Sequence, residues 1–281
     1  MNIIKKFMQM DRRYVFALVG ICVLIPLLLP IGLPTWVTKP TRDFFNAIDN
    51  IPPNQKPILL SFDFTASTMP ENMPMAEAVL RHCFGKGIRV LLMTHYPAGT
   101  GMIEIALDKV LKEYEKKYGE DYVFLGYMPG GSAVMLSLGE SIRRTFPKDY
   151  YGNKVDTLPM MADVHNYDDI PLVVSISGSA LPLYWIIYAG TTYRQKVACG
   201  VTAVSAPEFY PYLETGQFEG MLGGLKGASE YENLVERYNY SNPDVRKTAS
   251  IGMDAQSLAH FLIIVLVILG NVAFFAIKRS K

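Results

Sequence analysis

The sequence predicts an α/β fold with a doubly wound, mostly parallel five-stranded sheet, flanked by one N-terminal and one C-terminal transmembrane helix. Two observations lead to this prediction. Two stretches without acidic or basic residues, 14–38 and 255–277, lie at opposite ends of the 281-residue chain. Each is long enough to cross a bilayer, because roughly 20 apolar residues span the hydrocarbon core as a helix. Between them, short apolar runs alternate with helical patterns, which is typical of parallel strands covered by helices on both faces.

The division of the chain follows from these patterns. A Rossmann-like α/β domain is predicted over residues 58–237, with connectors at 39–57 and 238–254 on either side. The chain is 50% hydrophobic, 19% charged and has a net charge of +1. A nearly neutral protein lacks the basic face that binds phosphates, so we expect no nucleic-acid partner. The bilayer itself is the first predicted partner.

Lys and Arg residues near the two apolar stretches favour one orientation. Seven lie toward the ends of the chain and four on the side of the domain. Cytoplasmic segments carry the excess of these residues. We therefore expect two spans in the inner (cytoplasmic) membrane, both termini (residues 1–13 and 278–281) in the cytoplasm, and the domain outside it. The alternative for the first span is a cleaved signal peptide, but its apolar run is longer than usual and no A-x-A-like site follows.

Both predicted spans contain residues that favour contact with another helix. Pro26, Pro30 and Pro34 recur every four residues in the first span, which predicts a kink or a packed neighbour. In the second span Asn271 stands among small and apolar residues. An amide in this position favours a helix–helix contact, with the headgroup region at the end of the span as the alternative. The partner is either the chain's own first span or another subunit.

Five apolar runs predict the strands of the domain. Ligands of parallel α/β sheets bind outside the carboxyl ends of the strands, so the residues that follow each run are the candidates for a site. Small, glycine and hydroxyl residues recur there, although they are also ordinary turn and helix-cap residues. The predicted strands are residues 58–64, 88–94, 121–128, 171–177 and 197–205.

Two chemical interpretations of this edge are open. Ser177 or Ser179 would be the nucleophile of a serine hydrolase with His95 as base and Asp63 or Glu208 to orient it, but the G-x-S-x-G elbow is missing. The segment Gly130, Gly131 and Ser132 would bind a small anion through its backbone amides at a helix start. It lacks the Lys-Ser/Thr of a P-loop, and a plain turn with Ser132 as the N-cap of the helix is the favoured interpretation.

Metal, cofactor and disulfide signatures are weak. The four histidines share no ligand spacing with one another or with the three cysteines, so we predict neither a metal nor a cofactor. Cys83 and Cys199 fall on a predicted helix and strand, where free core thiols are expected. A disulfide between them remains the alternative.

A glycine-rich segment, residues 217–230, is the most unusual local feature. Each glycine costs a helix about 1 kcal/mol relative to alanine, so close approach of another backbone is expected. The two interpretations are a subunit or membrane interface and packing on the domain's own sheet. The interface residues would be Gly220, Gly223, Gly224 and Gly227, together with Asn271.

The residues Gly224-Leu225-Lys226-Gly227-Ala228-Ser229-Glu230-Tyr231-Glu232 carry a resemblance. With the preceding glycine-rich turn, they are similar to an uncharacterised family of bacterial and archaeal membrane-anchored α/β proteins. The resemblance covers about a fifth of the chain and implies a prokaryotic origin but no activity or catalytic residue.

These patterns favour a non-catalytic function. We expect an extracytoplasmic binding or scaffold subunit of a larger membrane assembly, formed with other subunits or with further copies of the chain. A membrane-anchored serine hydrolase and a small-anion-binding sensor are the alternatives.

Overall fold

The computed structural model describes residues 11–279 and divides the chain into two compact units. One unit is the domain, residues 35–249. The other joins the two ends of the chain, up to Pro34 and from Ser250 onward. Residues 1–10 and 280–281, which belong to the predicted cytoplasmic ends, lie outside the described residues.

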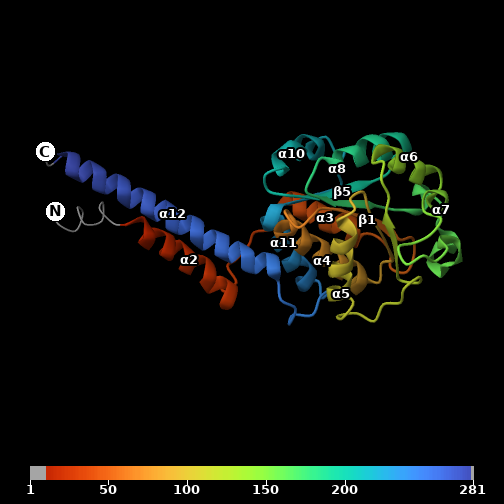
Figure 1. The fold of residues 1–281 in the computed structure, drawn as a ribbon, viewed down its shortest axis with the longest axis horizontal. Coiled ribbons are helices and arrows are strands. Elements are labelled where there is room, and N and C mark those ends of the chain that lie inside the picture. The colour runs from red at the N-terminus through yellow and green to blue at the C-terminus, as the bar shows by residue number, and fades with distance from the viewer. Residues whose placement is uncertain (1–10, 280–281) are drawn as a thin grey trace. The chain divides into compact units, whose positions relative to one another are not determined.

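The domain contains one parallel sheet of six strands in the order β3-β2-β1-β4-β5-β6 (Figure 1). The predicted α/β class is confirmed, but the predicted number of five strands is wrong. The missed strand, β6, has only three residues, Met221–Gly223, and pairs with β5. Its apolar residues recur at helical spacing among glycines, so neither length nor alternation marked it as a strand. The strands are β1 (Ile58–Asp63), β2 (Val90–Thr94), β3 (Tyr122–Tyr127), β4 (Val173–Ser177), β5 (Val197–Val201) and β6.

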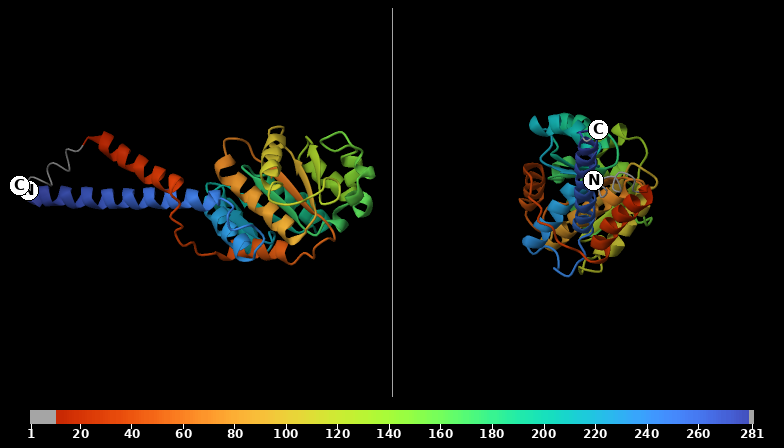
Figure 2. Two further views of the ribbon diagram at one scale, coloured as in Figure 1. Left: turned by 90° about the horizontal axis from the view of Figure 1, so that it is seen from below. Right: turned by 90° about the vertical axis from the view of Figure 1, so that its left-hand side faces the viewer.

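Helices cover both faces of this sheet. Alternate residues of β1 illustrate the division: Leu60 packs into the core under one helix layer and Leu59 into the core under the other. The first layer is α3 (Lys39–Asp49), α4 (Met69–Lys86), α5 (Gly99–Val110) and α11 (Gly224–Arg237), with α4 and α11 side by side (Figures 1 and 2).

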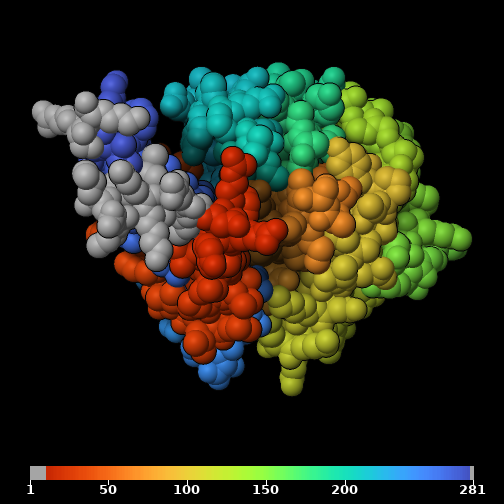
Figure 3. Space-filling model, turned by 60° about the vertical axis from the view of Figure 1, so that its left-hand side comes forward, coloured from red at the N-terminus to blue at the C-terminus, as the bar shows by residue number. Residues whose placement is uncertain are grey.

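The second layer lies over the opposite face, where its helices form the green-to-cyan surface in Figure 3. Its helices are α6 (Ser132–Glu140), α7 (Ile142–Thr145), α8 (Leu181–Tyr184), the π-helix η4 (Trp185–Gly190), α9 (Thr191–Tyr193) and α10 (Ala206–Glu214). The long loop before β4 contains three short 3₁₀ turns: η1 (Val155–Thr157), η2 (Pro159–Asp163) and η3 (Tyr167–Asp169).

The segment before β1, predicted as a connector over 39–57, contains helix α3. Phe44, Phe45 and Ile48 of this helix are buried in the core. Gly220, just before β6, lies so close to Phe44 that a Cβ atom there would overlap the Phe44 backbone. Helix α3 therefore covers the edge of the sheet at β6, which keeps that edge from pairing with another chain.

The unit formed by the chain ends contains α2 (Arg12–Leu28) and most of α12 (Thr248–Arg279). Within the described residues, one helix is long and apolar enough to span a membrane, residues 248–278, and a stretch of 18 residues in it has a mean hydropathy of 2.6. Helix α2 has 17 residues and ends at Leu28, so the C-terminal part of the predicted first span, 14–38, is not helical. The backbone amides of Gly32 and Leu33 donate to the Asp254 carboxylate at 2.8 and 3.0 Å, which joins the two ends of the chain.

Candidate functional site

The carboxyl ends of β1 and β4 lie side by side at the centre of the sheet, with Asp63 paired in register with Ser177. The chain passes from β1 to β2 and β3 on one side, then returns to β4 on the other. Such a reversal of strand order is where open α/β sheets bind ligands. The structure therefore places Asp63, Ser177 and the following Ser179 at the predicted edge, and His95 follows the neighbouring strand β2.

The Asp63 carboxylate is fully buried at this edge. It accepts hydrogen bonds from Ser61 Oγ at 2.6 Å, from the His95 backbone amide at 2.6 Å and from Thr94 Oγ1 at 3.3 Å. Burial raises the pKa of Asp63, because the loss of hydration outweighs the nearby His95 and these hydrogen bonds. Burial therefore favours the protonated form of this carboxyl group.

The two candidate serines contact each other and the backbone. Ser177 Oγ lies 3.1 Å from the Asp63 carbonyl oxygen, to which it can donate, and 2.9 Å from Ser179 Oγ. The Ser179 amide donates to Ser177 Oγ at 3.1 Å. Glu208, the alternative to Asp63 as the residue that orients His95, is exposed in the first turn of α10.

The His95 side chain is 7% exposed. Neither ring nitrogen has a hydrogen-bond partner among the described residues. Its ring lies 5.6 Å, centroid to centroid, from that of Trp185, the first residue of η4, and the Trp185 indole nitrogen also lacks a partner there. Ser175 Oγ, on the same face of β4 as Ser177, is a fourth such atom. We refer to Asp63, His95, Ser175, Ser177 and Trp185 as the polar cluster.

This geometry brings Ser177, Ser179, His95 and Asp63 to one edge of the sheet, but it does not form the hydrogen bonds from serine to histidine to carboxylate that a serine hydrolase needs. A serine nucleophile needs a base within hydrogen-bond distance, whereas the His95 ring contacts neither serine by a hydrogen bond. Asp63 binds the backbone amide of His95 instead of its ring.

The crevice on the other side of the β1 and β4 ends is filled by side chains. Gly178 lies against Thr68, so that a Cβ atom there would stand 2.6 Å from Thr68 Oγ1. Glu71 occupies the first turn of α4, and its carboxylate accepts the Ala203 amide at 2.7 Å. A carboxylate at this helix start disfavours a second anion there. The residues of this turn therefore do not fit a dinucleotide pyrophosphate.

The predicted anion segment forms the turn into α6. Gly130 and Gly131 have φ angles of 118° and 45°, a conformation that glycine adopts without strain. The Ala133 amide donates to the Gly130 carbonyl at 3.0 Å, and Gly131 rather than Ser132 is the N-cap. An ordinary turn accounts for these contacts.

The glycines of the 217–230 segment contact the domain itself. A Cβ atom on Gly224 would overlap Ala203, and one on Gly227 would approach the Leu222 backbone. Gly223 lies in ordinary contact distance of Ala206, and Gly220 lies against α3. In α12, Asn271 Nδ2 donates to the Val267 carbonyl of its own helix at 3.0 Å. Internal contacts therefore explain the glycines, and the amide of Asn271 finds an acceptor without a second helix.

The cysteines of the domain are free and buried. Cys83 belongs to the core on one face of the sheet and Cys199 to the core on the other, which excludes a disulfide between them. Burial raises the pKa of both thiols, so neither is reactive. Within the described part of the chain, no group of three or more His, Cys, Asp and Glu side chains is placed to hold a metal ion.

Sequence reasoning missed a second polar arrangement, on helix α11. Glu230 Oε2 accepts the Thr38 amide at 2.9 Å and the Thr38 hydroxyl at 2.6 Å. Glu232 Oε1 accepts the Ala249 amide at 3.0 Å, and Asn233 Nδ2 donates to Thr35 Oγ1 at 2.8 Å. We call Glu230, Glu232 and Asn233 the α11 clamp. It holds the chain where it enters the domain and where it leaves.

The only available signal for this clamp was the pair of acidic residues in the 224–232 motif. Both carboxylates are buried, and a buried carboxylate requires hydrogen-bond donors. Yet the partner Thr38 is 192 positions away from Glu230. Spacing within the motif therefore gives no information about it.

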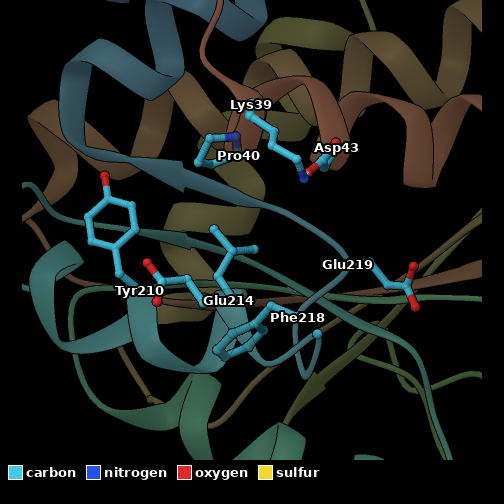
Figure 4. A pocket seen from close by; sticks show the side chains of 9 residues that line it. Lys39, Pro40, Asp43, Tyr210, Glu214, Phe218 and Glu219 are labelled. Atoms are coloured by element: carbon cyan, nitrogen blue, oxygen red, sulfur yellow. The ribbon is translucent and has the colours of Figure 1, made fainter.

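A groove of about 720 Å³ lies beside the clamp, between α3 and α10 (Figure 4). Lys39, Pro40 and Asp43 line it on the α3 side; Tyr210 and Glu214 face them from α10. Lys39 forms an ion pair with Asp43 at 2.6 Å and is 87% exposed. The groove is thus a mixed polar and aromatic surface directly after Thr38.

Comparison of the chain with protein-family models, with curated proteins and with solved structures finds no match. The resemblance of the 224–232 motif to a membrane-anchored family therefore stays a prediction, and the functional argument depends on the geometry.

Proposed function

We propose that the chain is a non-catalytic binding or scaffold subunit of a larger membrane assembly, with its α/β domain outside the cytoplasm. The observation that carries this proposal is the α11 clamp. A function that depends on the position of the domain needs its junctions with the membrane segments to be fixed. An enzyme whose substrate and product diffuse freely does not need fixed junctions of this kind.

The clamp meets this need through hydrogen bonds to two buried carboxylates. Thr38, at the start of the domain, binds Glu230, and Ala249, at its end, binds Glu232. Both carboxylates stand on one buried helix, so the two junctions are held by the same element. Lys247, which precedes α12, adds bonds to Asn233 and Glu236 at 3.0 and 2.7 Å.

The groove between α3 and α10 is the partner surface in this proposal. It begins one residue after the clamped Thr38, and its Tyr210 is 43% exposed. Tyrosine is enriched in contact surfaces between subunits, and the rims of such surfaces are polar.

The membrane arrangement belongs to the same proposal. Helix α12 supplies one span, and the apolar stretch 14–38, which begins within α2, supplies the other, with both termini in the cytoplasm. Protease protection in sealed vesicles tests this orientation. Digestion of the domain from the cytoplasmic side would contradict it.

The direct test is purification of the full chain from native membranes in a mild detergent. We expect a protein partner, or further copies of the chain, to co-purify in a fixed ratio. The double variant Tyr210→Ala, Glu214→Lys should lose the partner while keeping the melting temperature of the wild type. As a matched control, the exposed pair Tyr184→Ala, Glu140→Lys should keep it.

Two outcomes would overturn the proposal. One is a monodisperse monomer from native membranes in several mild detergents. The other is covalent labelling of Ser177 or Ser179 by a fluorophosphonate probe, which would indicate the hydrolase.

A further inference from the structure

The polar cluster contains buried atoms that the protein leaves without hydrogen bonds. Both ring nitrogens of His95, the indole nitrogen of Trp185 and Ser175 Oγ have no partner in the described part of the chain. Buried polar atoms are almost always bonded, so each exception needs an explanation. The neighbouring rings of His95 and Trp185 carry three of these unbonded nitrogens, and this points to a ligand.

The position of the cluster favours the same interpretation. It lies where the strand order reverses, at the carboxyl ends of β1, β2 and β4. Trp185 opens a π-helix, η4, and π-helical turns inside helices are frequent at functional sites. His95 is nearly closed off from solvent, so the ligand must be small.

The chemistry of the unpaired atoms defines the ligand. The indole N–H of Trp185 only donates, and His95 donates from at least one nitrogen in every protonation state. The site thus offers two or more donors between neighbouring rings. A carboxylate is a compact group with two acceptor oxygens, and charge-assisted hydrogen bonds to it are strong.

The charges of the cluster are compatible with an acid. Burial raises the pKa of the Asp63 carboxyl group, which favours its uncharged form beside a bound acid. The hydroxyl oxygens of Ser61 and Thr94 lie within hydrogen-bond distance of this group and are able to accept a hydrogen bond from its protonated form.

We propose that His95 and Trp185 bind the carboxylate of a small organic acid at the carboxyl ends of β1, β2 and β4. This inference is independent of the proposed scaffold function, because Trp185 packs on the face of the sheet opposite to α11 and the ligand is a different class of partner. Either can fail while the other holds.

The experiment uses the full chain in detergent, labelled with ¹⁵N in the tryptophan side chains, with acetate as the probe. The chain has only two tryptophans, and Trp36 is 86% exposed. We expect acetate to shift the indole signal of Trp185 in a saturable manner while Trp36 stays unchanged. Chloride at equal ionic strength should shift neither.

Variants then assign the contact. His95→Phe should weaken acetate binding about tenfold or more, as expected for loss of a charged hydrogen bond. The exposed control His165→Phe should bind acetate like the wild type. If His95→Phe does not fold, the wild-type titration still decides: no saturable shift of Trp185, or an equal shift of Trp36, would overturn the proposal. So would binding that His95→Phe leaves unchanged.

Discussion

The α11 clamp and the polar cluster both bury polar side chains, and they differ in how these side chains are bonded. Glu230 receives hydrogen bonds from Thr38, 192 positions away, and Glu232 receives one from Ala249, 17 positions away. At the carboxyl ends of the strands, His95 and Trp185 are equally buried, yet their side-chain nitrogens have no partner among the described residues.

This difference distinguishes buried polar side chains that stabilise the fold from buried polar side chains that are available to a ligand. Removing a bonded group leaves its partners unsatisfied, which costs stability. Removing a group that has no partner relieves a desolvation cost. Substitutions of the clamp carboxylates should therefore destabilise the domain, and substitution of His95 should not.

The largest effect is expected for Gly220→Ala, on the clamp side. The added methyl group would overlap the backbone of Phe44, so α3 would have to move away from the sheet. We expect a loss of about 3 kcal/mol in the free energy of unfolding, at the upper end for overpacking. Urea denaturation of the full chain in detergent measures it.

Gly101→Ala is the matched control. Gly101 lies in α5 with open space around its Cα. Alanine should stabilise this helix by up to about 1 kcal/mol. Equal destabilisation by both substitutions would show that the contact between Gly220 and α3 is not special.

The pH dependence of stability should be almost as large. His82, in α4, is fully buried between the rings of Phe45 and Tyr240 and bonds to Tyr231 at 2.7 Å. Burial lowers the pKa of His82 from 6.5 to about 4, although the neighbouring Asp49 opposes this. The folded state therefore favours the neutral ring, and unfolding is promoted when the unfolded chain takes up the proton.

The sign follows from this shift. The contribution of His82 is complete above about pH 6.5 and is lost as the pH falls toward about 4, a total of about 3 kcal/mol. Unfolding free energies measured between pH 7.5 and 4.5 should decline in the wild type and decline less in His82→Gln. The exposed His165→Gln should follow the wild type. A wild-type stability that does not change over this range would contradict a buried neutral His82.

Glu230→Leu tests the clamp itself. Leucine has a similar size but accepts no hydrogen bond, so the amide and hydroxyl of Thr38 lose their acceptor. We expect a loss of about 2 kcal/mol, measured by urea denaturation. Glu140→Leu, which removes an exposed ion pair with Arg144, should change stability by less than about 1 kcal/mol. A Glu230→Leu protein as stable as the wild type would show that the hydrogen bonds of the clamp do not stabilise the domain.

The polar edge could be predicted from the sequence because it depends on local order. Alternation of strands and helices is enough to place Asp63, His95, Ser177 and Ser179 at the same side of a parallel sheet, and the structure places them there. It does not determine whether their side chains meet. That depends on rotamers and on η4, whose Trp185 lies beside His95.

Contacts between residues far apart in the chain could not be predicted from the sequence. Helix α3 follows an apolar stretch and resembled a connector, but Phe44 and Ile48 complete the core. Strand β6 has three residues and gains its identity only by pairing with β5. In the 224–232 motif, the carboxylates were visible but their partners, at the two ends of the domain, were not.

The most direct measurement of this contrast is the unfolding free energy of His95→Phe, without added organic acid, compared with that of Glu230→Leu. Phenylalanine keeps a ring beside Trp185 and removes two buried nitrogens that have no partner in the described residues. We expect the unfolding free energy of His95→Phe to equal that of the wild type or to exceed it by up to about 1 kcal/mol, whereas Glu230→Leu should be destabilised. A loss of about 2 kcal/mol or more in His95→Phe would show that His95 is bonded within the protein, and it would contradict the distinction between the two regions.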